Sequence, residues 1–419
     1  MPIVVARSGD VLKLLFCCEN YPPSVGGVQE VIRQIAERLA IAGHDVTVAT
    51  SAHSSRPADT VRNGVRVLSF PITGNWVRGM HGPLDEYMQF VIQGGFDAVC
   101  IKAAQQWTFD ALVEVLPSIP SRKIFIPCGF SALYQRHFKR YFAQMPRWLR
   151  SVDALVFYAS EYRDIQFVQR HGLRQIFVIP NGADEREFDG GKEEVFRDAH
   201  SIGYDDLLFL TVGSMTGLKG HWEVARAFEL AKFSGPATLV LNGNTPQRSI
   251  GGKVKQFVTN IMRGRSSLSA MAARINAQQG ERKRVILCDL PRAQLVAAFK
   301  ASDLFVLASY VEYSPLVLFE AVAAGTAFLS SPAGNAKEIA EWTQGGEIFP
   351  CPACSDGFLS PEPEVLARHL EAITVDRSHL REIGQCGRSS FVSNGYSWAK
   401  ISLQYEAILT GSPKQLPYL

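Results

Sequence analysis

Residues 11–50 read VLKLLFCCENYPPSVGGVQEVIRQIAERLAIAGHDVTVAT, and this stretch decides the fold. An apolar run over residues 11–18 leads into a loop, and apolar side chains then recur at helical spacing. The apolar face of that helix carries Val28, Val31, Ile32, Ile35 and Leu39. Gly43 marks the end of the helix, and residues 46–49 begin a second apolar run. Strand, helix and strand in this order predict a βαβ unit of a parallel sheet.

The same alternation continues along the rest of the chain. Further strands are expected at residues 65–70, 98–101, 123–126, 155–158 and 177–179, and after a Pro-Asn-Gly turn at 207–212, 238–242, 285–288, 304–308 and 327–330. We therefore expect an α/β protein with two Rossmann-like parallel-sheet domains facing a cleft, over residues 1–182 and 183–395. Ligands of such sheets bind at the carboxyl ends of the strands.

Composition limits the class of protein. The chain has 419 residues, enough for two or three domains, and 47% of them are hydrophobic, so a large core can form. Lys plus Arg (43) nearly balances Asp plus Glu (40), which does not favour a nucleic-acid partner. Charged residues interrupt the first eighteen residues, so we expect no signal peptide or membrane span and a cytoplasmic location. Cys351 and Cys354 lack a second cysteine pair, so no metal site is expected.

Two stretches are locally basic. Residues 246–284 contain nine Lys and Arg side chains and one acid, which suits either a solvated helix pair or a surface for an anionic acceptor or membrane. The stretch RHFKRYFAQMPRWLRS, from Arg136 to Ser151, interleaves basic and aromatic residues. It has the composition of an interfacial helix on anionic lipid, which would place the protein peripherally at the inner face of a membrane. Packing of Phe138, Phe142 and Trp148 into the core explains it equally well.

In each predicted domain, the loop after the first strand contains a candidate phosphate-binding group. Gly26 and Gly27 stand between a strand and a helix, where bare backbone N–H groups can approach a phosphate, although tight turns also need glycine. The loop GSMTGLKG, residues 213–220, occupies the same point in the second domain and contains Lys219. A lysine at this edge can neutralise a departing phosphate, or it can be an ordinary solvated side chain.

The segment EYSPLVLFEAVAAGTAFLSSP, residues 312–332, carries two glutamates eight positions apart. Glu312 lies in the loop after a strand, and Glu320 lies about one turn into the next helix. Both carboxylates can point to the edge of the sheet, with the N–H groups of Leu316 and Val317 between them. Carboxylates accept hydrogen bonds from sugar hydroxyls and backbone donors bind pyrophosphate, so the segment suits a nucleotide sugar.

Four motifs in register resemble the retaining glycosyltransferases of family 4, which have the GT-B fold. They are YPPSVGGVQEVIRQIAERLAIAGHDVTVAT (21–50), VIPNGAD (178–184), VGSMTGLKGH (212–221) and EYSPLVLFEAVAAGTAFLSSPAGNAKEI (312–339). The resemblance implies a nucleotide-sugar donor on the second domain, an acceptor on the first, and closure between them. It also implies that the last segment, residues 396–419, crosses back to the first domain.

The resemblance assigns roles by position. Glu320 would hold the ribose and Glu312 the donor sugar, while Lys219 and the backbone amides would bind the diphosphate; Lys219 and Glu312 are the candidate catalytic residues. The expected donor-binding residues are Gly26, Gly27, Ser214, Lys219, Glu312, Ser314, Leu316, Val317 and Glu320. No metal is expected, since the chain has no D-x-D motif, and no cofactor, because the nucleotide sugar is a substrate.

Two departures from the family pattern stand out. Ser214 replaces an Arg that many relatives carry before the lysine, so one of two diphosphate cations is missing, and Arg248 is one candidate replacement. Cys128 replaces a His that helps to position the donor sugar; we interpret this thiol as a packing group. Cys128, Gly129 and Asn335 are expected to shape the sugar pocket.

The expected activity is retaining transfer of a hexose-type sugar from a nucleotide sugar to a glycan or lipid-linked acceptor, in surface polysaccharide or glycan biosynthesis. The alternative is a catalytically weak relative that binds nucleotide or glycan without efficient transfer. A dehydrogenase is disfavoured because no G-x-G-x-x-G follows a strand, and an epimerase because its acids and histidines are absent. The sugar, the base and the acceptor stay open.

Overall fold

The first βαβ unit is present in the computed structural model, which describes residues 11–189, 193–244, 267–279, 282–354 and 357–412. β1 (Lys13–Cys17) and β2 (Asp45–Ser51) pair in parallel, and α1 (Gly27–Ile41) connects them. The chain forms two compact units: unit 1 comprises Met1–Asn181 with Trp398–Leu419, and unit 2 comprises Gly182–Ser397.

The sheet of unit 1 has the strand order β10-β9-β8-β7-β1-β2-β4-β3. The strands beside β1 and β2 are β3 (Asp59–Arg62), β4 (Val65–Phe70), β7 (Ala98–Lys102), β8 (Arg122–Ile126), β9 (Ala154–Phe157) and β10 (Ile176–Val178). Neighbouring strands pair in parallel except β3 and β4, which are antiparallel. Sequence analysis missed β3 because its residues are polar and largely exposed, so they show no alternation.

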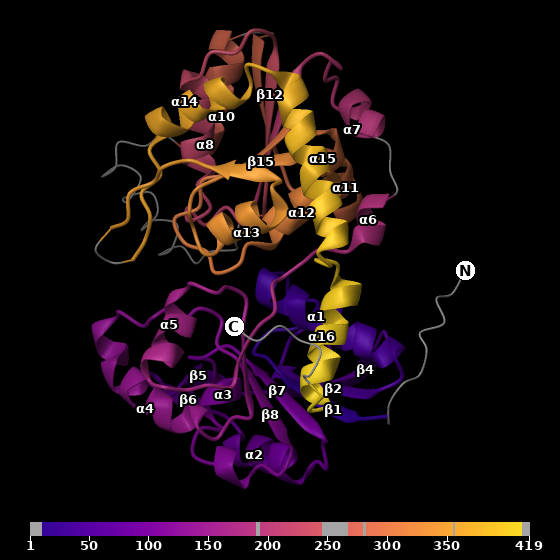
Figure 1. Ribbon diagram of the computed structural model, residues 1–419, viewed down its shortest axis with the longest axis vertical. Coiled ribbons are helices and arrows are strands. Elements are labelled where there is room, and N and C mark those ends of the chain that lie inside the picture. Colours follow the sequence, from indigo (N-terminus) through magenta and orange to yellow (C-terminus); the bar gives the residue numbers. More distant parts are fainter. Residues whose placement is uncertain (1–10, 190–192, 245–266, 280–281, 355–356, 413–419) are drawn as a thin grey trace. The chain divides into compact units, whose positions relative to one another are not determined.

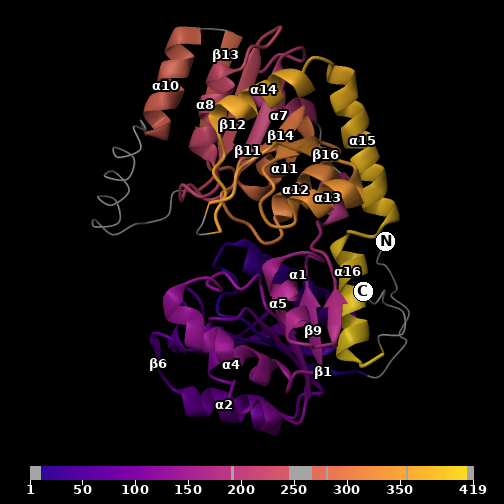
Figure 2. The same cartoon turned by 60° about the vertical axis from the view of Figure 1, so that its left-hand side comes forward.

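Helices cover the sheet of unit 1, and a small hairpin accompanies them. Besides α1, the helices are α2 (Leu84–Gln93), α3 (Trp107–Asp110), α4 (Lys139–Leu149), α5 (Arg163–Arg170) and α16 (Trp398–Leu409). The 3₁₀ turns are η1 (Leu116–Ser118) and η2 (Arg136–Phe138), and the hairpin consists of β5 (Thr73–Asn75) and β6 (Gly79–His81). The last helix, α16, lies beside α1 (Figures 1 and 2). His44 Nε2 lies 3.3 Å from Glu406 Oε1, and Arg122 Nε donates to the Ile408 carbonyl at 2.7 Å.

The basic and aromatic stretch forms η2 and α4. Phe138, Phe142 and Trp148 are only 3%, 5% and 2% exposed, because they pack in the core of unit 1 with Tyr141 and Met145. Exposed basic side chains remain on the other face of the stretch: Arg136, Lys139, Arg140, Arg147 and Arg150. The aromatic rings are therefore structural, and any anionic partner would meet only the cations. Among the helices that the structure describes, none has the length and apolar character needed to cross a bilayer.

Unit 2 contains a parallel sheet with the order β13-β12-β11-β14-β15-β16. Its strands are β11 (Leu207–Val212), β12 (Ala237–Asn242), β13 (Lys283–Cys288), β14 (Leu304–Leu307), β15 (Ala327–Ser330) and β16 (Gly346–Ile348). Its helices are α6 (Glu185–Asp189), α7 (Glu193–Ala199), α8 (His221–Leu230), α10 (Leu268–Gln279), α11 (Arg292–Ala301), α12 (Leu316–Ala324), α13 (Ala336–Thr343), α14 (Pro363–Ile373) and α15 (Arg377–Ser393). The strand order reverses between β11 and β14, and ligands of open α/β sheets bind at such a reversal.

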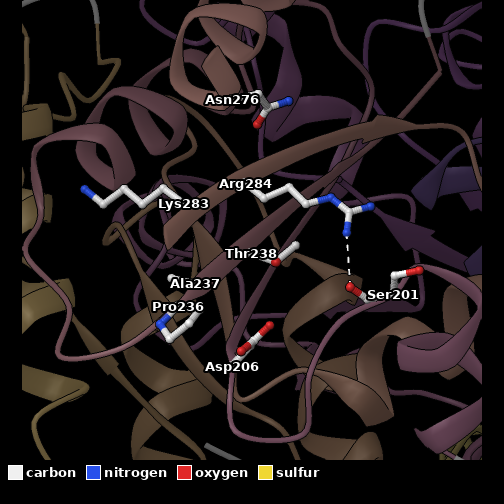
Figure 3. A pocket seen from close by; sticks show the side chains of 8 residues that line it. All are labelled: Ser201, Asp206, Pro236, Ala237, Thr238, Asn276, Lys283 and Arg284. Carbon is white, nitrogen blue, oxygen red and sulfur yellow. Dashed lines mark hydrogen bonds between the residues drawn. The ribbon is translucent and has the colours of Figure 1, made fainter. Parts of the chain in front are cut away.

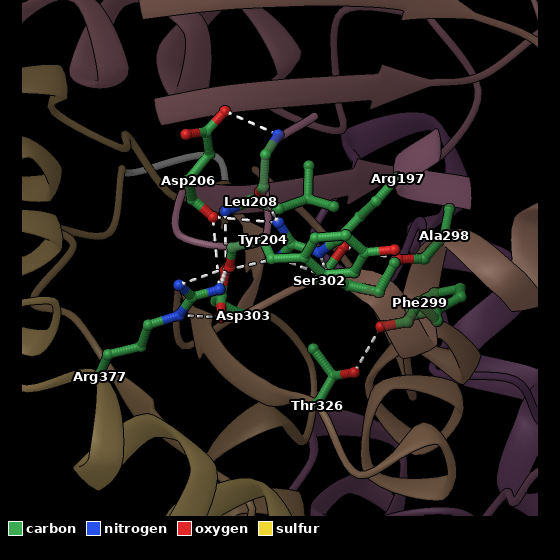
Figure 4. Close-up of polar contacts among 12 residues, drawn as sticks. Arg197, Tyr204, Asp206, Leu208, Ala298, Phe299, Ser302, Asp303, Thr326 and Arg377 are labelled. Atoms are coloured by element: carbon green, nitrogen blue, oxygen red, sulfur yellow. Dashed lines mark hydrogen bonds and ion pairs between the residues drawn. The ribbon is translucent and has the colours of Figure 1, made fainter. Parts of the chain in front are cut away.

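A buried acid anchors the amino ends of β11 and β14. The Asp303 carboxylate accepts hydrogen bonds from Arg197 Nη2 at 3.0 Å, Arg377 Nε at 2.7 Å and the backbone N–H of Leu208 at 2.9 Å (Figure 4). Asp303 and Arg197 are both nearly excluded from solvent, so their charges compensate each other. This network is structural, because it lies at the opposite end of the strands from the edge where ligands bind.

Candidate active site

Two loops that leave neighbouring strands bring Lys219 and Glu312 together. Lys219 follows β11 and Glu312 follows β14, and these two strands pair directly. Lys219 Nζ donates to Glu312 Oε1 at 2.6 Å, and Ser309 Oγ donates to the same oxygen at 2.7 Å. The Glu312 side chain is 11% exposed and that of Lys219 is 29% exposed. The reversal in strand order thus places a cation and a carboxylate side by side.

Glycines fix the course of the lysine loop. Gly220 has φ +73°, and a Cβ there would lie 1.9 Å from the Ala308 carbonyl oxygen, so only glycine lets this loop approach the end of β14. A Cβ on Gly213 would lie 3.0 Å from Lys219 Cγ, so the bare backbone makes room for the lysine stem. Backbone N–H of Tyr310 donates to the Leu218 carbonyl at 2.9 Å and joins the two loops.

His221 begins α8 directly after the lysine loop. Its Nε2 faces the Asn242 carbonyl at 3.4 Å, and its Nδ1 is buried with no hydrogen-bond partner among the described residues. Burial is the main cause that lowers the pKa of His221 to about 4, and the nearby Lys219 charge acts in the same direction. The imidazole is therefore neutral at physiological pH and does not supply the second cation.

The amino end of α12 stands between the two glutamates of the motif. Pro315 is the N-cap residue of this helix, and it contributes no side-chain hydrogen bond to the first turn. The amides of Leu316 and Val317 belong to this first turn, where N–H groups point away from the helix. Ser314, half-buried, stands one residue before Pro315. The first turn of the helix thus contains two backbone donors of the kind that bind anions, and the binding of a diphosphate there stays a prediction.

Glu320 is held by an arginine that sequence analysis missed. Arg292 Nη1 donates to Glu320 Oε1 at 2.6 Å, and Arg292 Nε donates to Glu187 Oε2 at 3.1 Å. Burial lowers the pKa of Arg292, but the Glu320 and Glu187 carboxylates outweigh it and raise that pKa above its usual value. One signal was present: Arg292 begins a helix, where the macrodipole disfavours a cation unless acids compensate it.

Other predicted site residues fall into two groups. In unit 2, Ser214 is half-buried in the lysine loop, and backbone N–H of Asn335 donates to the Tyr313 carbonyl at 2.9 Å, which ties Asn335 to the Glu312 loop. Gly26, Gly27, Cys128 and Gly129 belong to unit 1. The described cluster of charged groups is therefore made by unit 2 alone.

Cys128 has the character of a packing group. Desolvation raises the pKa of its thiol, so the sulfur is protonated and a poor nucleophile at neutral pH. Its φ is +58°, an uncommon conformation for a residue with a side chain, and Gly129 follows with φ +83°. Backbone N–H of Gly129 donates to Asp164 Oδ2 at 2.8 Å, which holds this turn in place.

The basic stretch over residues 246–284 carries little that can be assigned. Arg248, Lys253, Lys255, Arg263 and Arg265 lie outside the described residues. Three of the described members have partners: Arg274 Nη2 pairs with Glu229 Oε2 at 2.8 Å, Lys283 Nζ donates to the Glu229 carbonyl at 2.8 Å, and Arg284 Nη1 donates to the His200 carbonyl at 2.7 Å. The fourth, Arg282, is exposed.

A cavity of about 430 Å³ opens at the amino ends of β12 and β13 (Figure 3). Its lining includes Lys283, Arg284 and Asn276, and Arg284 also donates to the Ser201 carbonyl at 3.3 Å. Asn276 donates to the Val285 carbonyl at 3.0 Å and accepts from its N–H at 2.7 Å. The polar groups of this cavity already serve the fold, and it lies at the opposite edge from Lys219 and Glu312.

Comparison with known proteins identifies the family of the chain. A model for "Glycosyl transferases group 1" matches residues 192–390, and a model for "Glycosyltransferase Family 4" matches residues 25–187. The chain belongs to the family 4, group 1 glycosyltransferases. Its fold is GT-B, as expected, and the first rivals, a dehydrogenase and an epimerase, are set aside.

Individual relatives are distant. An uncharacterized glycosyltransferase of Methanocaldococcus jannaschii is 24% identical over 349 residues, which cover 78% of this chain and 82% of that protein. Sucrose-phosphate synthase of Thermosynechococcus elongatus aligns with a TM-score of 0.71 at 17% identity, over 96% of this chain and 98% of that one. HepE of Anabaena, in complex with UDP-glucose, aligns with a TM-score of 0.66 at 16% identity, over 96% and 100% of the chains.

Proposed function

We propose that this glycosyltransferase moves a hexose-type sugar, with retention of configuration, from a nucleoside diphosphate sugar to a glycan or lipid-linked acceptor. The observation that carries the proposal is the Lys219–Glu312 pair at the reversal of the unit 2 sheet, where the next element along the chain is α12, which begins after Pro315. A cation, backbone donors and sugar-binding carboxylates are the groups that a nucleotide sugar needs. The UDP-glucose complex of the similarly folded HepE supports a donor of this class.

In this proposal each group of the site has one task. Lys219 has three N–H donors, one of which contacts Glu312, so the others can reach the diphosphate. The amides of Leu316 and Val317 bind the same phosphates, Glu312 accepts from hydroxyls of the sugar, and Glu320 accepts from the ribose. Ser214 and Ser314 flank the diphosphate, and the resemblance to the family also assigns the amides of Gly26 and Gly27 to it.

The chemical step follows from these positions. The bond from C1 of the sugar to the β-phosphate oxygen breaks, and a bond from C1 to the acceptor oxygen forms on the same face. The acceptor proton passes to the departing phosphate oxygen. Negative charge develops on the diphosphate, so the protein acts by stabilising that charge with Lys219 and the α12 amides and by holding both substrates. Retention is supported by the resemblance to the family.

We also propose that the reaction needs no divalent metal, because Lys219 and the helix amides take the role of the counter-ion. The test is transfer activity in excess EDTA, which should equal activity with added Mg²⁺. A loss in EDTA that Mg²⁺ restores would show that a metal belongs to the site.

The acceptor site is assigned to unit 1, and a membrane-borne acceptor is supported by the exposed cations beside α4. An anionic lipid surface attracts each exposed Lys or Arg by about 1 kcal/mol. We propose that the protein works in the cytoplasm, peripherally at the inner face of the membrane, on a surface polysaccharide or another glycan.

The competing function is a relative that binds nucleotide or glycan without efficient transfer. It is favoured by Ser214 and Cys128, which stand where relatives carry a cation and a histidine. A thermal-shift panel of UDP, GDP, ADP and NAD against wild type and Glu320→Ala tests the donor site, since ligand at a hundred times its Kd adds about 2.7 kcal/mol of stability.

One nucleoside diphosphate should stabilise wild type clearly more than the variant. A transfer assay with the matching sugar nucleotide then separates the two functions, because a binding protein would show the shift but no product. No shift with any nucleoside diphosphate would contradict the donor site itself.

A further inference from the structure

Arg292 joins two acids that come from other elements. Its guanidinium donates to Glu320 on α12 and to Glu187 on α6, and the ring of Phe188 lies 5.8 Å from the guanidinium carbon. Glu187 Oε2 accepts from both Nε and Nη2 of Arg292. Arg292 is therefore clamped from one side by Glu187 and presents its remaining edge to Glu320.

We infer that Arg292 is a positioning residue for recognition of the nucleotide ribose. It fixes the Glu320 carboxylate in the orientation in which that carboxylate accepts hydrogen bonds from the ribose hydroxyls. This inference rests on the proposed function, in which Glu320 binds the ribose. Arg292 itself acts through Glu320 and is not assigned a contact with the reacting atoms.

Burial and charge explain why Glu320 needs such a partner. Its side chain is only 14% exposed, and a buried carboxylate without a cation is unfavourable. Without Arg292, Glu320 and Glu187 would be left near each other as like charges, and Glu320 would turn away or take up a proton. A carboxylate has about four acceptor sites, so it can accept from Arg292 and from other donors at the same time. A carboxylate that is already fixed also loses less side-chain entropy when the ribose binds.

The same geometry separates Arg292 from the diphosphate. Each glutamate of the motif has its own cation: Lys219 pairs with Glu312, and Arg292 pairs with Glu320. The diphosphate is assigned to Lys219 and the α12 amides. Removal of Arg292 should therefore reduce the preference for ribose over deoxyribose and leave the affinity for the phosphates unchanged.

The experiment measures binding of three probes by calorimetry: UDP, 2′-deoxy-UDP and inorganic pyrophosphate, with GDP and ADP and their 2′-deoxy forms in parallel. Wild type should prefer the ribonucleotide by about tenfold, the effect of one charge-assisted hydrogen bond. Arg292→Met should bring this ratio close to one, while the affinity for pyrophosphate stays within about twofold.

Matched variants make the result specific. Glu320→Gln should lose the ribose preference as Arg292→Met does. Arg292→Lys should be intermediate, because lysine keeps the charge but not the fork. Glu187→Gln should weaken the preference for the ribonucleotide, since it removes the charge that holds the Arg292 guanidinium. Arg226→Met is the control: Arg226 pairs with Glu229 within α8 at 2.5 Å, and its loss should leave all three affinities unchanged.

The outcomes separate the two levels of inference. If wild type and Glu320→Gln prefer neither ribonucleotide nor deoxynucleotide, the role of Glu320 in the proposed function is wrong. If Glu320→Gln loses the preference but Arg292→Met and Arg292→Lys keep it in full, the positioning role is wrong and the proposed function stands. A large loss of pyrophosphate affinity in Arg292→Met would make Arg292 a phosphate ligand and would also overturn the inference.

Discussion

Ionisable groups at the carboxyl edges of the two sheets have different partners: ions of opposite charge in unit 2 and neutral groups in unit 1. In unit 2, Glu312 and Glu320 each contact a cation and keep partial access to solvent. In unit 1, Lys102 ends β7 fully buried, and its Nζ donates to the Tyr158 hydroxyl at 2.6 Å. Asp110, also buried, accepts from the Tyr141 hydroxyl at 2.5 Å and from the Trp76 N–H at 2.9 Å. Among the residues that the structure describes, neither the Lys102 ammonium nor the Asp110 carboxylate forms an ion pair.

This difference shows in the pKa values. Burial lowers the pKa of Lys102, and burial raises the pKa of Asp110 to about 6 in spite of its hydrogen bonds. Burial in unit 1 thus disfavours the charged forms of Lys102 and Asp110, whereas the carboxylates of unit 2 are compensated by cations. A site for an anionic diphosphate needs the second arrangement, because paired charges can exchange partners when the ligand arrives.

The largest expected effect breaks the unit 2 pair at its cation. Lys219→Ala should lower kcat/KM by about 10²–10³-fold, the range for loss of one donor to a developing anion. The melting temperature should change little, since a partly exposed ion pair contributes only about 0–1 kcal/mol. Steady-state transfer kinetics and thermal unfolding on the same samples measure both. Equal losses of activity and stability would mean that Lys219 is structural.

The next effect tests the raised pKa of Asp110 in unit 1. The folded state binds the Asp110 proton more tightly than the unfolded state, so its contribution to stability is present below pH 3.8 and is lost as the pH rises to about 6. The total is at most about 3 kcal/mol. Asp110→Asn should remove this slope, as urea unfolding at several pH values would show. Parallel pH profiles of the two proteins would contradict the raised pKa.

A smaller effect separates the two paired carboxylates. Glu312→Gln should weaken binding of the sugar nucleotide by about tenfold and leave binding of the free nucleoside diphosphate unchanged, while Glu320→Gln should weaken both. Competition binding with the two ligands measures the difference. If the two variants lost affinity for the two ligands to the same extent, the separate assignment of Glu312 to the sugar and Glu320 to the ribose would be wrong.

The smallest effect concerns the exposed cations of unit 1. Arg140→Gln should reduce partition onto phosphatidylglycerol vesicles by about fivefold at low salt, with no change on neutral vesicles, since one surface charge contributes about 1 kcal/mol. Vesicle sedimentation is the measurement, and Arg381→Gln on α15 of unit 2 is the matched control. If both variants bind like wild type, the basic face of α4 has another role.

Sequence patterns predicted the sheets well and the site in part. Strands expected at residues 207–212 and 327–330 are present with those bounds, because continuous apolar runs are typical of buried parallel strands. The eight-residue spacing of Glu312 and Glu320 also predicted two carboxylates on consecutive elements. Both results depend on residues that are close in the chain.

Contacts between distant segments could not be predicted. Arg292 and Glu187 are 105 positions apart, and their meeting depends on the packing of α6 against α11, which no local pattern encodes. Nor does helical periodicity distinguish an aromatic face in a core from one in a lipid surface, so the position of Phe138, Phe142 and Trp148 needed the structure. The positive φ of Cys128 likewise has no signature in the residue type.

The two glycine contacts of unit 2 bear on the kinetics of binding. A Cβ on Gly220 would strike the end of β14, and one on Gly334 would lie 2.3 Å from the Tyr313 carbonyl oxygen, so both site loops are pressed onto neighbouring backbone. Their conformational entropy is therefore lost during folding and not during ligand association. A ligand that reaches this edge meets loops that are already ordered, so differences in affinity between ligands should reside mainly in their dissociation rates.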